Sequence, residues 1–154
     1  VHISVEATTV GSGILLSQDV DIYEGDSSAE TVVRMLQNNG YSVDYTGNYE
    51  TGFYLARISS ESNFVTGNIP EDLRTKLEEH GFEIYDFTPN SLGDYDFTKG
   101  SGWMYQVNGV YPNYGLSDYC FQNGDTLRLR FTLAYGADIG QDMTGGSDNW
   151  GYEW

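Results

Sequence analysis

Aromatic and amide side chains gather in one stretch of the chain, between Ser101 and Tyr119. Aromatic rings give a large contact area at little entropic cost, and tyrosine hydroxyls add hydrogen bonds that orient a ligand. The stretch therefore indicates a stacking platform for a planar or ring-shaped ligand. The alternative is that the same rings pack one end of a small sheet. The candidate ligand-binding residues are Trp103, Tyr105, Tyr111, Asn113, Tyr114 and Tyr119.

A pocket and the exposure of the rings distinguish binding from packing for these residues. Loops carried by rigid strands often bind ligands, so Tyr111, Asn113, Tyr114 and Tyr119 are the first candidates. A binding role predicts an apolar pocket with several of these rings more than half exposed. Rings buried in the core would favour packing.

Acidic residues offer a second chemistry. Asp94 and Asp96 share a loop with a glycine, and Asp138, Asp142 and Asp148 lie near the C-terminal end. Calcium takes many oxygen ligands, so loop aspartates could bind it, but no stretch has EF-hand spacing. The alternative is a solvated acidic surface. We assign no metal site, and calcium binding stays an open expectation.

No catalytic constellation is recognised. The chain has two histidines, His2 and His80, and one cysteine, Cys120. These are too few for a tetrahedral zinc site, and no third group orients a nucleophile. His80 suits the C-terminal end of a helix, and Cys120 suits packing. The sequence therefore predicts a protein that is not an enzyme, with no catalytic residues and no cofactor.

Two of the seven basic residues, Arg128 and Arg130, alternate with apolar residues near the C-terminal end. They therefore share the polar face of a strand and could receive an acidic partner chain. The alternative is pairing with a local carboxylate on a neighbouring strand.

The charge balance limits the partners. Seven basic and 23 acidic residues give a net charge of −16. Nucleic acids and anionic membranes require a positive surface, so neither is expected as a partner. No apolar run is long enough to insert in a bilayer. The chain starts at Val1 without a signal peptide, and we expect that targeting information has been removed.

The elements that must position these residues follow from periodicity. Helices are expected over 27–39, where Ser27 and Glu30 fit a capping box, and over 70–80. Asn108-Gly109 predicts a two-residue turn. After Gly136 no periodicity remains, and Trp150, Tyr152 or Trp154 could hold this tail. The expected strands are 1–10, 14–23, 41–45, 53–58, 82–87, 103–107 and 126–133.

The run SGWMYQVNGVYPNYGLSDY (101–119), followed by Asn123-Gly124-Asp125 and Phe131-Thr132-Leu133, resembles the transcobalamin-like C-terminal domain family. The resemblance covers most of residues 1–140 and is looser over 59–90. It implies an α+β, β-grasp-like fold, in which a mixed sheet packs on one helix, with a helix-strand insertion at about 59–90. We expect one domain over 1–136 and a flexible, acidic, Gly-rich tail over 137–154.

The resemblance also implies a function. Such domains occur in bacterial surface proteins, so we expect a non-enzymatic extracellular binding or adhesion module of a secreted or cell-surface protein. Its partners would be a protein or small-molecule ligand and the other domains of a larger chain. One alternative is a carrier domain for cobalamin or a related corrinoid. The other is a structural spacer, with no pocket and no exposed aromatic cluster.

Overall fold

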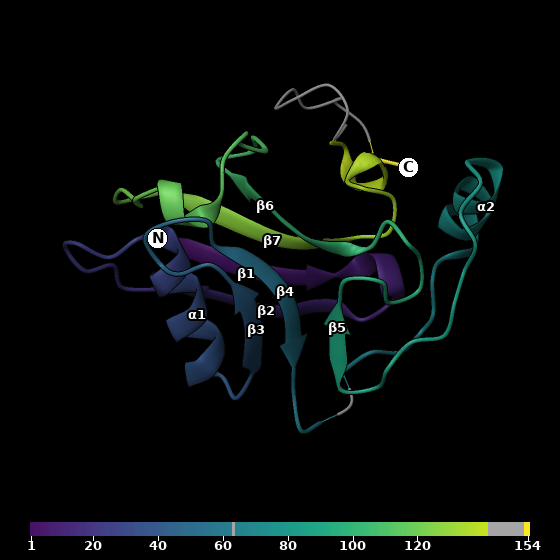
Figure 1. Cartoon of the computed structure of the whole chain (residues 1–154), viewed down its shortest axis with the longest axis horizontal. Coiled ribbons are helices and arrows are strands. Elements are labelled where there is room, and N and C mark those ends of the chain that lie inside the picture. The colour runs from purple at the N-terminus through teal and green to yellow at the C-terminus, as the bar shows by residue number, and fades with distance from the viewer. Residues whose placement is uncertain (63, 142–152) are drawn as a thin grey trace.

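The computed structural model describes residues 1–62, 64–141 and 153–154, which form two sheets and two α-helices (Figure 1). The strands are β1 His2–Ala7, β2 Gly13–Asp19, β3 Ser42–Thr46, β4 Tyr54–Ser59, β5 Ser91–Gly93, β6 Gly102–Val107 and β7 Thr126–Thr132. The helices are α1 Ser28–Asn38 and α2 Glu71–Glu79, and short 3₁₀ turns are η1 Thr8–Val10, η2 Leu116–Asp118 and η3 Ala137–Ile139. The α+β class is confirmed.

The first sheet has the order β2-β1-β7-β6. Its central pair, β1 and β7, is parallel, and the two outer pairs are antiparallel, so the sheet is mixed as expected. On β7, Leu127 and Leu129 are buried on one face, and they alternate with Arg128 and Arg130. Strand periodicity thus gives β7 one apolar and one charged face.

Local sequence determines α1. The backbone N–H of Glu30 donates to the Ser27 hydroxyl at 3.3 Å, which is the cap expected at the N-terminus. Val32, Val33 and Leu36 are fully buried and belong to the same core as the apolar face of the first sheet. Among the described residues, neither α1 nor α2 has the length and apolar character needed to cross a membrane. The two helices lie at opposite ends of the molecule (Figure 1).

The structure adds a second sheet to the single sheet that the sequence predicts. Its order is β3-β4-β5, and both pairs are antiparallel. The segment 59–90 contains α2, as expected, but the strand predicted over 82–87 is wrong. Phe82 and Ile84 are partly buried against the core, so their alternation reports burial of one side, and Phe87, which is out of phase with them, is also partly buried. No β-ladder forms there, and β5 instead pairs with β4.

The expected flexible tail is corrected at its start. Asp138 and Ile139 in η3 are 3% and 2% exposed. The Asp138 carboxylate accepts hydrogen bonds from the Thr132 hydroxyl and from the Leu133 N–H, and both donors lie at the end of β7. At the far end, Trp154 stacks on His80. The tail residues Trp150 and Tyr152 lie outside the described residues.

Candidate functional site

The turn after β6 directs the aromatic segment. Asn108 and Gly109 both have positive φ, at 51° and 85°, which defines the expected two-residue hairpin turn. The N–H and C=O groups of Val107 and Val110 exchange hydrogen bonds of 2.9 and 3.0 Å. The Asn108 side chain also donates to Asp125, 2.9 Å away, so the turn is joined to the start of β7.

Tyr111 does not lie on an exposed loop surface, and this expectation is wrong. It is 1% exposed. Its hydroxyl donates to the carbonyl of Ile139 at 2.6 Å and accepts from Arg130 at 3.1 Å. Arg130 belongs to the charged face of β7, so Tyr111 packs on that face of the first sheet. Burial of a tyrosine requires such partners, and they depend on contacts distant in sequence.

Trp103 is a packing residue that joins the two sheets. Its indole N–H donates to the carbonyl of Leu92 in β5 at 2.9 Å, and its ring meets Phe131 edge-on at 5.2 Å. It is 6% exposed. The packing alternative therefore accounts for this ring.

Three of the predicted residues do come together at the surface. The Tyr105 hydroxyl donates to the backbone carbonyl of Tyr114. The rings of Tyr114 and Tyr119 stack, with centroids 6.2 Å apart and planes at 21°. Tyr105 and Tyr119 are partly exposed and Tyr114 is 46% exposed, so none of the candidate rings is more than half exposed, which differs from the exposure expected of a binding role. Asn113, next to Tyr114, is exposed.

Sequence analysis missed Tyr54, which belongs to the same region. Tyr54 starts β4 and lines one hollow with Tyr105 of β6. It is 46% exposed. Tyr54 lies in the strand expected at 53–58, but alternation does not single it out, because Ala56 and Ile58 share its side, and Tyr105 lies about 50 residues away in the chain. We call Tyr54, Tyr105, Tyr114 and Tyr119 the tyrosine surface.

The hollow at the tyrosine surface is small. Its volume is about 100 Å³. Binding sites for drug-sized ligands enclose roughly 300–1,000 Å³. A ligand at this place therefore contacts the rings from outside and does not enter a cavity. The other lining residues are Phe53, Leu55, Trp103, Gly115, Leu116 and Leu129.

The hydroxyls of the tyrosine surface are held by the protein. Tyr54 donates to the Asp94 carboxylate at 2.7 Å, and Tyr119 donates to that of Asp125 at 2.6 Å. Burial raises the pKa of Tyr54, and Asp94 adds to this effect. Burial also raises the pKa of Tyr105, and the hydrogen bond to Asp125 raises the pKa of Tyr119 to about 12. All three hydroxyls stay protonated near neutral pH, so none of them presents a negative charge to a ligand.

A braced loop borders Tyr54. Arg57 of β4 donates to the Asp96 carboxylate at 2.7 Å and to the backbone carbonyl of Asp94 at 3.2 Å. The N–H of Gly93 donates to Asp96 at 2.9 Å. Between the two aspartates, Tyr95 has a φ of 67° and is 75% exposed. Asp94 and Asp96 thus serve as internal acceptors, which explains the pattern first considered for calcium.

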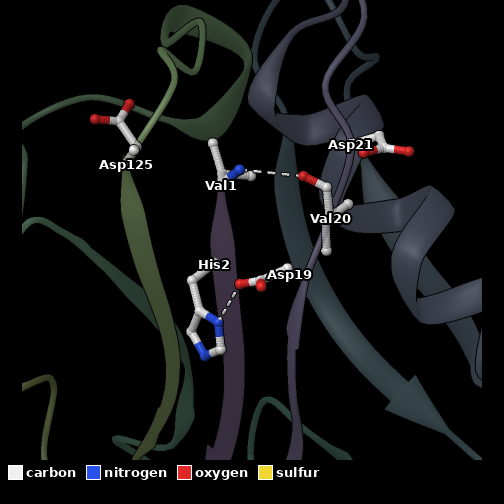
Figure 2. Close-up of a pocket in the computed structure, with 7 residues that line it drawn as sticks. Val1, His2, Asp19, Val20, Asp21 and Asp125 are labelled. Atoms are coloured by element: carbon white, nitrogen blue, oxygen red, sulfur yellow. Dashed lines mark hydrogen bonds and ion pairs between the residues drawn. The ribbon is translucent and has the colours of Figure 1, made fainter.

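An acidic pocket of about 370 Å³ lies at the ends of β1 and β2 (Figure 2). His2 contacts Asp19 at 2.9 Å, and the amino group of Val1 donates to the carbonyl of Val20 at 3.1 Å. Figure 2 shows Asp19 turned toward His2, whereas Asp21 and Asp125 point away from each other. The carboxylates do not converge, so this pocket lacks a cation-binding arrangement.

Residues of the types that bind metals or act in catalysis lie apart from one another in the described part of the chain. Over 1–62, 64–141 and 153–154, no three His, Cys, Asp or Glu side chains group closely enough to hold a metal ion. Asp142 and Asp148 lie outside these ranges. Cys120 is exposed, which differs from the buried position expected for it.

The two arginines of β7 have different partners. Arg128 makes two 2.8 Å hydrogen bonds to the Glu6 carboxylate in β1, which is the cross-strand pairing considered above. Arg130 is 4% exposed and pairs with Glu153. The pairing alternative thus describes Arg128, and Arg130 contacts a residue near the C-terminal end.

Part of this region is similar to a known family. Residues 81–132 match the model of a family described as "Domain of unknown function (DUF4430)". This is a family of transcobalamin-like domains, which agrees with the resemblance over that segment. The match includes β5, β6 and β7, and hence the tyrosine surface apart from Tyr54. No curated protein matches the chain. The resemblance expected over most of residues 1–140 is therefore supported by the family model over 81–132.

Proposed function

We propose that this protein is a non-enzymatic binding module of a larger extracellular or cell-surface protein, and that it contacts its ligand through the tyrosine surface. The observation that carries the proposal is that Tyr54 of β4 and Tyr105 of β6 line one hollow, while the Tyr105 hydroxyl donates to the backbone carbonyl of Tyr114 in the following loop. The resemblance to a transcobalamin-like domain supports a binding role.

The shape of the tyrosine surface favours a sugar as the ligand. Tyr54 and Tyr114 are each 46% exposed, and the hydroxyls of Tyr54 and Tyr119 are engaged with carboxylates. Flat aromatic faces stack on the apolar face of a sugar ring, and nearby polar groups such as Asn113 can bind its hydroxyls. The net charge of −16 disfavours a strongly acidic ligand.

The carrier alternative requires more enclosed space than the domain offers alone. A corrinoid is larger than a typical drug-sized ligand, and the hollow measures about 100 Å³. Corrinoid binding would therefore need a second domain that completes the site.

The test is a binding screen of the whole chain against labelled oligosaccharides, with cobalamin and cobinamide titrated in parallel. We expect saturable binding of a glycan that weakens about fivefold or more in Tyr114→Ala, because one stacking face is lost. Tyr85→Ala is the matched control, since Tyr85 is also 46% exposed and lies outside the tyrosine surface. Tight corrinoid binding would replace the proposal with the carrier function. Glycan binding that is unchanged in Tyr114→Ala, or no glycan binding at all, would contradict the proposal.

A further inference from the structure

A third pocket, distinct from the hollow and from the acidic pocket of Figure 2, lies on the opposite face of β7 from the tyrosine surface. Leu129 lines the hollow at the tyrosine surface, and the next residue, Arg130, lines this pocket. Its volume is about 280 Å³. The other lining residues are Thr8, Thr9, Pro70, Asp72, Leu73, Asp138, Ile139, Glu153 and Trp154.

Arg130 is the charged centre of this pocket. Its guanidinium is 4% exposed and donates to the Ile139 carbonyl at 3.3 Å and to the Glu153 carboxylate at 2.5 Å. Within the described ranges, Glu153 is the one carboxylate that forms an ion pair with Arg130. The neighbouring carboxylate, Glu6, is engaged with Arg128. A buried guanidinium without a counter-charge is strongly unfavourable, so this site requires an acidic group.

The guanidinium also has donor capacity that the described residues do not use. The Nε atom of Arg130 is buried and has no hydrogen-bond partner among them. Glu153 contacts a different nitrogen, Nη1, and remains about half exposed. Arginine can bind a carboxylate through two parallel hydrogen bonds. A carboxylate that also accepted from Nε would therefore bind Arg130 more tightly than Glu153 does through Nη1 alone.

The residue after Glu153 is bound by different chemistry. The indole of Trp154 stacks on the ring of His80, with centroids 4.2 Å apart and planes at 24°. Its backbone N–H donates to the carbonyl of Asp138 at 3.1 Å. Two adjacent residues are thus held by an ion pair, a ring stack and a backbone hydrogen bond, from β7, the end of α2 and η3.

We propose that the Arg130 pocket is a peptide-binding site for a glutamate followed by an aromatic residue, and that Glu153 and Trp154 occupy it within the same chain. The site lies on the other face of the sheet from the tyrosine surface, so it does not depend on the proposed function. When residues 153–154 leave the pocket, it binds the same sequence supplied as a separate peptide.

The test uses the full chain carrying E153Q and W154A, which frees the pocket without shortening the protein. The probe is a capped, fluorescently labelled peptide with the sequence of residues 148–154, followed by anisotropy. We expect the double variant to bind this peptide at least ten times more tightly than the intact chain, in which the tethered segment competes. The same peptide with Gln in place of its glutamate should bind at least ten times more weakly.

Two results would overturn the proposal: equal peptide affinity for the intact and double-variant chains, or equal affinity for the Glu and Gln peptides. If the double variant no longer unfolds cooperatively, the single E153Q chain takes its place and the same comparisons decide. Sedimentation velocity of the intact chain tests whether Glu153 and Trp154 occupy the Arg130 pocket of their own chain. If they do, we expect the protein to be a monomer. A concentration-dependent dimer that E153Q dissociates would instead mean that two copies exchange the segment.

Discussion

The hydroxyl of Tyr111 lies between the carbonyl of Ile139 and the guanidinium of Arg130. We predict that Tyr111→Phe lowers the free energy of unfolding by about 1–3 kcal/mol, because both buried partners lose a hydrogen bond. Urea unfolding measures this change. The control is Tyr135→Phe, at a ring that is 51% exposed, where we expect a change within about 0.5 kcal/mol. Equal effects at both positions would mean that the buried contact contributes no net stability.

Glu6 makes stability depend on pH. Burial raises its pKa, but hydrogen bonds from Arg128 and Ser4 outweigh burial and hold the pKa below its ordinary value of 4.5. A carboxyl whose pKa is lowered by folding contributes stability above its unfolded pKa and loses it as pH falls through the folded pKa.

We therefore predict that the free energy of unfolding falls as pH decreases below about 4.5, by at most about 1.4 kcal/mol per pH unit for this one group. Glu6→Gln should be less stable at pH 7, since Arg128 loses its counter-charge, and its stability should fall less steeply with acid. Urea unfolding at pH 7, 4 and 3 compares the two chains. Parallel pH profiles would rule out Glu6 as a source of the dependence.

At the scale of elements, the sequence predicts what short-range rules control. Ser27 and Glu30 define the start of α1, because helix capping depends on residues close in the sequence. Asn108-Gly109 forms the predicted turn after β6, because these two residues readily adopt positive φ. Phe82–Phe87 alternates like a strand but forms no β-ladder, because alternation reports which side is buried and not which strand is adjacent. The sequence did not predict the second sheet for the same reason, because β4 pairs with β5, which lies more than 30 residues later in the chain.

The segment after α2 is held by side-chain packing, and Gly67 tests this. The Phe87 ring stacks on Phe97 at 5.2 Å and lies against Gly67, where an added Cβ would come within 2.2 Å of it. Gly67 also has a φ of +70°. We predict that Gly67→Ala destabilises the fold by about 1–3 kcal/mol more than Gly25→Ala, owing to overpacking. Gly25 is the matched control, since its φ is +89° and no other group lies within 4 Å of its added Cβ.

Thermal or urea unfolding of both glycine variants measures the difference. The αL strain of about 1–2 kcal/mol is common to both and cancels in the comparison. An equal loss at Gly67 and Gly25 would mean that Phe87 moves away at no cost, and that the segment is loosely packed.

At the scale of the whole molecule, β7 separates two surfaces with different chemistry. Its apolar face lies behind the tyrosine surface, and its charged face carries Arg130, which lines the Arg130 pocket. The sequence predicted the two faces, and it singled out Tyr105, Tyr114 and Tyr119, which the structure brings together. It could not predict the position of Tyr111, the inclusion of Tyr54 or the pairing of Arg130 with Glu153, since each depends on segments brought together only by the complete fold.

The net charge of the whole molecule determines how cations affect its stability. With a net charge of −16, self-repulsion destabilises the compact state, and divalent cations screen it whether or not they bind specifically. Asp94, Asp96 and Asp125 are occupied as internal hydrogen-bond acceptors. We therefore predict that CaCl₂ and MgCl₂ at equal concentration raise the melting temperature equally, as followed by calorimetry up to about 5 mM. A specific calcium site would instead make Ca²⁺ the stronger stabiliser, because its larger, irregular coordination shell suits loop carboxylates that Mg²⁺ fits poorly. Such a difference, if Asp94→Asn abolished it, would show that the braced loop beside Tyr54 rearranges to bind calcium.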